Sequence, residues 1–354
     1  MVLETIYVVR HGFRMTWSVD PYAVRYYSNI PTPTGLPADP ALSSYGETQA
    51  EQLGVKLTLL DPPVDQIISS PYYRCLQTLK PGVLRLQKER GYRNGVLLES
   101  GFEEWYGETG DHREQPSPLA YHLLRRNFFP DLDLKWDEQR EGDTDSRGAD
   151  GVVRPNRYGE SIEGLHNRVA YALHKTIERA DREGWKTILI CMHAAVMISI
   201  GRALTGRMPE DVTEEDFKCF TASLSQYNRR KPYRTARDVP AVDAWDFRQQ
   251  DKVPRVQWEG VGVMGGWDCV LNSDCSFLSG GEERGWHFSG DESFIQDPNA
   301  FNDRENEAKL KQRGDASDPS NVADDLNLNR ALCVAVAQAG DEDEVEEDSS
   351  RSKL

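Results

Sequence analysis

Residues 5–17 read TIYVVRHGFRMTW, so that a strand-forming run leads directly into Arg-His-Gly. The run from 5 to 9 is almost continuously apolar, which is typical of a strand that is covered on both faces of a parallel sheet. Arg10 and His11 stand where this strand would end, and Arg14 follows three positions after His11. The stretch therefore predicts a buried strand that delivers an imidazole and two guanidinium groups to one edge of a sheet.

Three more runs of the same kind lie further along the chain. They are QIIS at residues 66–69, GVLLE at 95–99 and TILICM at 187–192. Helical apolar spacing occupies residues 47–60, 73–91, 161–183 and 195–205. Strands that alternate with helices in this way indicate an α/β fold. We therefore predict a three-layer sandwich with a mostly parallel central sheet flanked by helices.

Other segments interrupt the alternation. Residues 18–42 are rich in proline and tyrosine and predict a long loop, and the polar residues 131–159 predict an excursion over the surface. Between about 255 and 294 the pattern changes to short strand-like runs, VQWEGVGVM, GWDCVLNS and GWHF. We interpret them as a small antiparallel addition to the main sheet. The expected domain covers residues 1–295, with its core in residues 1–221.

The segment from 296 to 354 has little periodic apolar pattern. ALCVAVA at 331–337 predicts at most a weak helix, and DEDEVEED at 341–348 contains seven acidic residues in eight positions. Such a composition is typical of a solvated, disordered tail. The last three residues, Ser352-Lys353-Leu354, match a C-terminal peroxisomal address, so a peroxisomal location is one expectation.

Charge and hydropathy restrict the classes of partner. The 354 residues carry a formal net charge of -16, which disfavours direct binding to nucleic acid or to an acidic membrane surface. No run of 18 apolar residues occurs, and the first residues lack the basic region and apolar stretch of a secretory signal. We expect an intracellular protein of the cytoplasm or nucleus that does not contact membranes.

The cysteine pattern indicates neither a metal site nor a disulfide framework. No C-x-x-C pair occurs, and no cysteine lies near a histidine at the spacing of a zinc site. We expect reduced, mostly buried thiols and no metal or other cofactor. The six cysteines are Cys75, Cys191, Cys219, Cys269, Cys275 and Cys333.

Polar side chains follow each of the four predicted strands. In order along the chain they are Arg10 and His11, Ser70 and Arg74, Glu99, and His193. Ligands of an open parallel sheet bind in the crevice beyond the carboxyl ends of its strands. Because all four strands would end at the same edge, we expect these side chains to surround one site.

These residue types suit the transfer of a phosphoryl group to a side chain. A neutral imidazole such as His11 can attack phosphorus and form a covalent intermediate. Guanidinium groups match the nonbridging phosphate oxygens, so Arg10, Arg14 and Arg74 are candidate phosphate ligands. His193 would add a cationic or hydrogen-bonding group.

A carboxyl group would complete this chemistry. Glu99 is the candidate general acid, which protonates the leaving oxygen and then activates water. Glu103 and Glu104 are alternatives because they follow closely in the sequence. The remaining histidines have no such partners and are expected to be structural or exposed. They are His112, His122, His166, His174 and His287.

Three motifs resemble the core motifs of the histidine phosphatase superfamily, the phosphoglycerate-mutase-like group. They are VVRHG, SSPYYRCLQT and CMHAAV, and LLESGFEEWYG resembles the segment that holds the general acid of this family. The resemblance covers residues 1–221. It implies that His11 is phosphorylated, that Arg10, Arg74 and His193 form the phosphate pocket, that Glu99 is the acid, and that Arg14 is the additional arginine of the R-H-G-x-R branch.

A narrower likeness concerns the phosphatase-like domain of the fungal tau subunit of the RNA polymerase III initiation factor. It rests above all on CVLNSDCSFLSGGEERGWHF at residues 269–288. A weaker likeness concerns the phosphatase domain of ubiquitin-associated, SH3-containing proteins. Three functions are therefore open: a metal-independent phosphatase acting on a phosphorylated small molecule or phosphoprotein, a weakly active scaffold that assembles with transcription-factor subunits, and a metabolic phosphatase of peroxisomes.

Overall fold

A computed structural model describes residues 2–20, 25–28, 30–108, 114–135, 153–234 and 253–289. The first strand, β1 (Thr5–Arg10), pairs in parallel with β7 (Thr187–Met192), the middle strand of the sheet. β7 pairs in parallel with β4 (Gln66–Ser69), followed outward by β5 (Val96–Leu98) and β6 (Leu134–Lys135). On the other side of β1, β8 (Leu224–Arg229) and β9 (Trp267–Asp274) continue the sheet in antiparallel pairings. The result is a mixed, mostly parallel sheet in the order β6-β5-β4-β7-β1-β8-β9.

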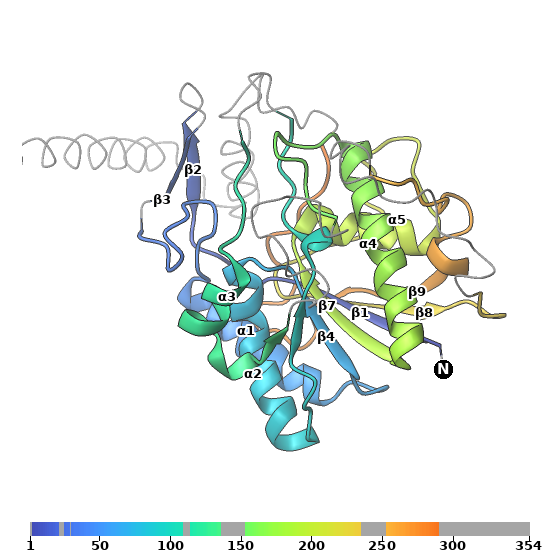
Figure 1. Ribbon diagram of the computed structural model, residues 1–354, viewed down its shortest axis with the longest axis horizontal. Helices are drawn as coiled ribbons and strands as arrows, with labels where there is room; N and C mark the ends of the chain where they lie inside the picture. Colours follow the sequence, from blue (N-terminus) through green and yellow to red (C-terminus); the bar gives the residue numbers. More distant parts are fainter. Residues whose placement is uncertain are drawn as a thin grey trace, which may run out of the picture. The chain divides into compact units, whose positions relative to one another are not determined.

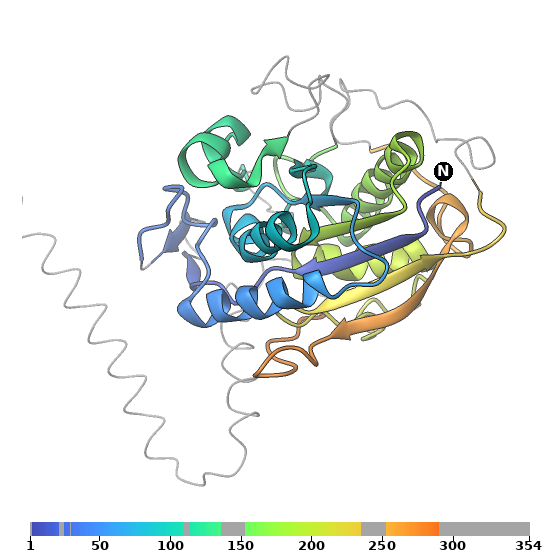
Figure 2. The same cartoon turned by 90° about the horizontal axis from the view of Figure 1, so that it is seen from below.

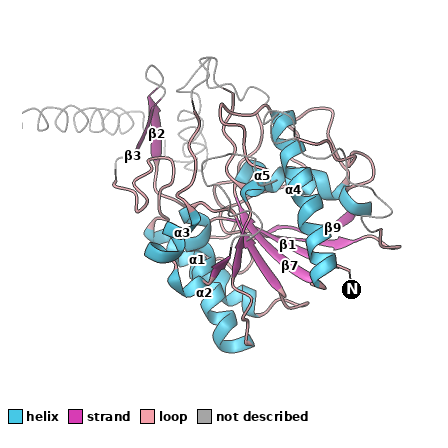
Figure 3. Cartoon of the chain, in the orientation of Figure 1, coloured by secondary structure: helices cyan, strands magenta, loops and turns pink. Residues whose placement is uncertain are grey.

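Helices cover both faces of this sheet (Figures 1 and 3). α1 (Ser44–Thr58) and α2 (Tyr73–Arg90) lie on one face, and α4 (Ile162–Glu183) and α5 (Ala194–Thr205) lie on the other. The strands supply two cores because successive side chains point to opposite faces. In β1, Ile6 and Val8 join the core under α4 and α5, whereas Tyr7 and Val9 join the core under α1 and α2. The predicted α/β sandwich is therefore confirmed.

The register of the parallel strands brings their ends to one edge. β1 and β7 align Arg10 with Met192, and β4 aligns Ser69 with Cys191. Backbone hydrogen bonds continue one residue beyond each strand, from His11 N to Met192 O (2.9 Å), from Ser70 N to Cys191 O (2.9 Å) and from Glu99 N to Ser69 O (3.0 Å). The residues after the strands consequently lie side by side.

Capping residues define where the long helices begin and end. Ser43 and Ser161 cap the N-termini of α1 and α4 through their side chains. Glycines with a left-handed backbone end α2, α4 and α5, namely Gly91, Gly184 and Gly206.

A short helical segment between β5 and β6 consists of α3 (Tyr121–Leu123), a π turn (Leu124–Phe128) and a 3-10 turn (Pro130–Leu132).

Several predictions of local structure were wrong. The expected loop at 18–42 contains a separate antiparallel pair, β2 (Trp17–Asp20) and β3 (Arg25–Ser28). β8, which follows the predicted core, and the short β6 were not expected. Of the three predicted C-terminal strands only GWDCVLNS forms one, and it is an edge strand of the main sheet, as Figure 2 shows. VQWEGVGVM fails because Gly260 and Gly262 adopt positive φ angles of 79° and 80°, which interrupt an extended backbone.

Some predictions lie outside the described residues. They concern the acidic tail at 296–354 with its helical run and terminal tripeptide, most of the excursion at 131–159, and Cys333. The predicted domain boundaries therefore stay predictions. Among the described helices, none combines the length and apolar character needed to cross a membrane.

Two matched glycines test the packing of the loop after β1. Gly46 and Gly164 occupy the same position in α1 and α4, and each donates its amide to the serine cap, at 3.1 and 3.0 Å. A Cβ atom on Gly46 would lie 2.0 Å from the Phe13 carbonyl oxygen, whereas one on Gly164 would approach nothing nearer than 3.4 Å. We predict that Gly46→Ala lowers the free energy of unfolding by about 1–3 kcal/mol.

Gly164→Ala is the control for this prediction. It should raise the free energy of unfolding by up to about 1 kcal/mol, because alanine favours a helix over glycine. Denaturant unfolding monitored by circular dichroism measures both values. Equal effects of the two substitutions would show that the contact between Gly46 and Phe13 does not constrain the loop.

Candidate active site

His11 lies at the centre of the edge where β1, β4 and β7 end. Its side chain is buried, and its ring centre is 5.4 Å from that of His193. Nδ1 lies 2.8 Å from the carbonyl oxygen of Gly12, and because a carbonyl only accepts, Nδ1 carries the proton. Burial, with the charges of Arg74, His193 and Arg10, holds the pKa of His11 well below its ordinary value. The imidazole is therefore neutral, with its lone pair on Nε2.

Arg74 is a buried guanidinium held from several sides. Nη1 donates to the Ala38 carbonyl (3.3 Å) and to Asp39 Oδ1 (3.4 Å), and Nη2 donates to Glu104 Oε2 (3.0 Å). The guanidinium also lies 4.6 Å from the centre of the Tyr72 ring. Its Nε is buried and has no hydrogen-bond partner among the described residues. A buried donor of this kind is costly without an acceptor, so Nε is suited to a ligand oxygen.

His193 is completely buried at the end of β7. Nε2 lies 2.8 Å from Ser70 Oγ and 3.7 Å from Cys75 Sγ, and Nδ1 lies 3.2 Å from Glu104 Oε2. Burial lowers the pKa of His193, but the negative charges of Cys75 and Glu104 outweigh it, so that the pKa is raised overall. The pKa values of His193 and His11 are thus shifted in opposite directions although their rings are neighbours.

Glu104 links the two cationic groups. Its Oε2 contacts both Arg74 Nη2 and His193 Nδ1. Burial raises the pKa of Glu104, but the charges of His193 and Arg74 hold it well below its ordinary value. Glu104 is therefore a carboxylate at neutral pH. The sequence offers Glu104 only as an alternative acid, because spacing alone does not show which of three nearby glutamates reaches His193.

A metal ion is a less suitable occupant of this cluster than an anion. Donor atoms of His11, Glu104 and His193 do lie within 4.8 Å of one another. However, the guanidinium of Arg74 contacts Glu104 and also lies 3.1 Å from His193 Nδ1. A positive charge thus already occupies the position at which these two donors would hold a cation.

Glu99 follows β5 at the same edge of the sheet, where its side chain caps a 3-10 turn. Its backbone continues the ladder beyond β5, and its Oε1 accepts a hydrogen bond from Gly101 N (3.0 Å). It thereby caps the 3-10 turn Ser100–Phe102, which leads to Glu104. The side chain is half-buried at the start of this turn.

The other predicted arginines contact backbone carbonyls. Arg10 Nη1 donates to the carbonyls of Cys219 and Arg284, both at 2.6 Å, which ties β1 to the segment after β9. Arg14 Nη1 donates to the Met15 carbonyl (3.1 Å), and its backbone bridges to Leu42. The charge of Arg10 also lowers the pKa of His11, and Arg74 is joined to His193 through the carboxylate of Glu104. The roles of Arg10 and Arg14 as phosphate ligands stay predictions.

The remaining histidines lie apart from this cluster. His166 and His174 are buried in α4, and His166 stacks on Trp258 with ring centres 6.1 Å apart. His122 and His287 are exposed, and His112 lies outside the described residues.

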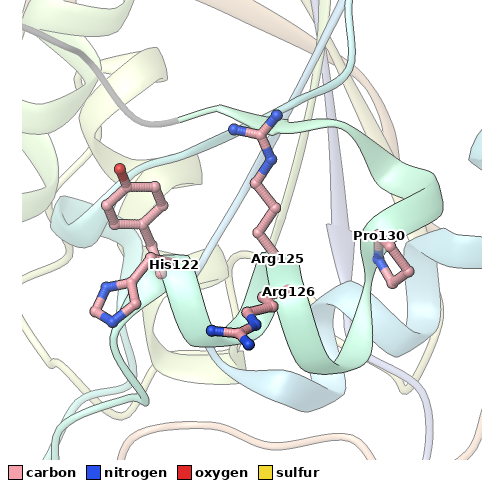
Figure 4. Close-up of a pocket in the computed structure, with 5 residues that line it drawn as sticks. His122, Arg125, Arg126 and Pro130 are labelled. Carbon is pink, nitrogen blue, oxygen red and sulfur yellow. The ribbon is translucent and has the colours of Figure 1, made fainter.

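A basic surface pocket was not anticipated. It has a volume of about 320 Å³ and is lined by Tyr121, His122, Arg125, Arg126 and Pro130 (Figure 4). Its segment is fixed to α2, because Tyr73 packs against the rings of Phe128 and Phe129 with centres 5.5 and 4.9 Å apart. The two arginines make the lining of this pocket basic, and Arg125 lies 3.7 Å from the carboxylate of Asp133. The sequence offered no signal for it, since the two arginines stand in a short segment without motif.

Comparison with known proteins gives one family. Residues 6–237 match the model of the histidine phosphatase superfamily, branch 1. The transcription factor tau 55 kDa subunit of Saccharomyces cerevisiae is 29% identical over 299 residues, which are 81% of this chain and 59% of that protein. The ecdysteroid-phosphate phosphatase of Drosophila melanogaster is 26% identical over 284 residues, 72% of this chain and 34% of that protein. The chain thus spans less than two thirds of the length of either relative.

Solved structures also resemble the chain. The ecdysone phosphate phosphatase of Bombix mori in complex with tungstate has 16% sequence identity and a TM-score of 0.46, covering 65% of this chain and 90% of that chain. A mycobacterial glucosyl-3-phosphoglycerate phosphatase has 14% identity and a TM-score of 0.40, covering 76% and 98%.

Proposed function

Because the chain belongs to the histidine phosphatase superfamily, we propose that it hydrolyses phosphate monoesters through a phosphohistidine intermediate on His11. The observation that carries this proposal is the state of His11. Its Nδ1–H is committed to the Gly12 carbonyl, and its Nε2 is an unprotonated nucleophile beside the charged pair of Arg74 and His193. A nucleophile and a cationic site for the phosphoryl oxygens are thus side by side.

In the first step the phosphate oxygens bind to the guanidinium of Arg74 and to the imidazolium of His193. Nε2 of His11 attacks phosphorus, an N–P bond forms, and the bond from phosphorus to the ester oxygen breaks. The leaving oxygen takes a proton from Glu99. Charge on the nonbridging oxygens is stabilised by groups that are already in place, which is the main source of catalysis in phosphoryl transfer.

In the second step water replaces the leaving group. Glu99, now a carboxylate, accepts a proton from this water while its oxygen attacks phosphorus. The N–P bond breaks, His11 returns to its neutral form, and inorganic phosphate leaves. Each step uses only side chains of this chain.

The choice of Glu99 over Glu104 as general acid follows from charge. A proton donor must be protonated when the leaving oxygen departs. Glu104 contacts two cationic groups that hold its pKa well below the ordinary value, so it is a poor donor. We assign Glu104 the role of fixing the positions of Arg74 and His193.

Removal of the nucleophile tests the proposed reaction. We predict that the protein hydrolyses p-nitrophenyl phosphate in the presence of EDTA, and that His11→Ala lowers kcat by at least about a thousandfold, because no covalent intermediate can form. His287→Ala, a change of an exposed histidine, should keep the wild-type rate. Turnover by His11→Ala at the rate of His287→Ala would refute the mechanism.

The roles of the two glutamates can be separated by the leaving group. Glu99→Gln should lower kcat/KM about a hundredfold or more for an alkyl phosphate, whose leaving oxygen needs a proton, and much less for p-nitrophenyl phosphate. Glu104→Gln should affect both substrates equally, because it removes a charge that stabilises protonated His193. If the dependence on the leaving group followed Glu104 instead, the two assignments would have to be exchanged.

A second candidate function is supported by the similarity to the tau 55 kDa subunit. In this role the chain is a weakly active or inactive scaffold in the assembly of an RNA polymerase III transcription factor, and its location is nuclear. Affinity purification of the tagged chain from its own cells tests this role. Recovery of other transcription-factor subunits at equal yield with wild type and with His11→Ala would favour it, whereas robust turnover without such subunits would exclude it.

A further inference from the structure

Cys75 contacts His193 from the side opposite to Glu104. Sγ of Cys75 lies 3.7 Å from Nε2 of His193, and both residues are completely buried. The cysteine stands in the first turn of α2, next to Arg74. Thiolates are favoured at helix N-termini and beside cationic groups. This position thus combines both conditions for an ionised cysteine.

We propose, on the basis of the proposed function, that Cys75 is a positioning residue whose thiolate keeps His193 protonated for phosphate binding. Until a phosphate oxygen takes the place of Glu104, the imidazolium has an acceptor at each nitrogen. Nδ1 is paired with Glu104 Oε2 (3.2 Å), and Nε2–H is directed to Ser70 Oγ and Cys75 Sγ. Cys75 does not touch the substrate and acts only through His193.

The charges around His193 explain why a second anion is needed. Arg74 is a cation 3.1 Å from Nδ1, and the ring of neutral His11 lies 5.4 Å away. Glu104 is shared between Arg74 and His193, and the Tyr72 ring presents no charge at a centre distance of 5.1 Å. On the Nε2 side the neighbours are the Ser70 hydroxyl and the Cys75 sulfur.

Asp39, a further buried acid of this region, contacts Arg74. Its Oδ1 lies 3.4 Å from Nη1 of that guanidinium, and burial is the main reason that its pKa is raised to about 6. Arg74 lowers the pKa of Asp39 more than His193 does, so Asp39 mainly balances the charge of Arg74. The thiolate of Cys75 is consequently the anion that compensates the charge on the Nε2 side of His193.

The neighbouring thiol supports ionisation of Cys75. Burial raises the pKa of Cys75, but the adjacent thiol of Cys191 and the charges of His193 and Arg74 lower it to about 5. The Cys191 thiol itself lies 3.7 Å from the backbone carbonyl oxygen of Cys75. Cys191, in β7, has a pKa raised well above its ordinary value by burial, so it remains a thiol and a donor. The two cysteines are thus unlike in charge although they are neighbours.

Titration of His193 by NMR measures the effect directly. In Cys75→Ser and Cys75→Ala the pKa of His193 should fall by about 1–3 units, because an opposite charge in contact has been removed. Because protonated His193 binds phosphate in the proposed reaction, the alkaline limb of the pH profile of kcat/KM should move to lower pH by the same amount. At a fixed pH on that limb, kcat/KM should fall about tenfold for each unit by which the pKa of His193 falls. Cys275→Ser is the control, because Cys275 belongs to a separate small cluster and has a pKa raised to about 12, chiefly by burial.

The ultraviolet absorbance of thiolates gives an independent readout in the wild-type protein. We expect a thiolate band at neutral pH that disappears on acidification near pH 5 and is missing in Cys75→Ser. Absence of this band from wild type, or an unchanged pKa of His193 in both folded Cys75 variants, would overturn the proposal.

The titrations also separate this proposal from the proposed function. A lowered pKa of His193 in both Cys75 variants, together with the thiolate band, would support the contact even if wild type hydrolysed no phosphate ester, in which case the proposed hydrolysis alone would be wrong.

Discussion

The parallel pairing of β1 with β7 and of β7 with β4 is the constraint on which the site depends. Because the ladders continue one residue beyond the strands, His11 and Ser70 are fixed by backbone hydrogen bonds in addition to their side-chain contacts. Helices on both faces keep this sheet buried, and α2 and α5 begin directly at the same edge. The position of each reactive group is therefore a consequence of strand register, with the helices adding Arg74 and Cys75.

Neighbouring charges shift the pKa values of chemically similar buried groups in opposite directions. His11 and His193 are adjacent histidines, yet one is neutral and the other is stabilised as a cation by carboxylate and thiolate neighbours. Cys75 and Cys191 are adjacent cysteines with pKa values displaced in opposite directions. In each pair both members are buried, so the difference comes from the charges beside them, whose effect a low dielectric strengthens.

The sequence supported the sheet, its flanking helices and the meeting of His11, Arg74 and His193, because buried parallel strands and residues just after them leave a strong local pattern. It did not predict β8, in which apolar and polar residues alternate only partly. It also did not predict the pair of β2 and β3, because the proline- and tyrosine-rich sequence around them is typical of a loop. Glu104 and Cys75 were missed as contacts of His193 for a related reason. Which side of a turn or helix faces a given imidazole is decided by tertiary packing.

The carboxylate of Glu104 has a consequence for how tightly the site can hold its ligands. Arg74 and His193 already share this internal counter-ion. In the proposed reaction a phosphate would therefore exchange one anionic partner for another, and its net gain would be only the difference between the two associations. On that proposal a bare product ion would be held less tightly than an ester that makes additional contacts outside the cluster.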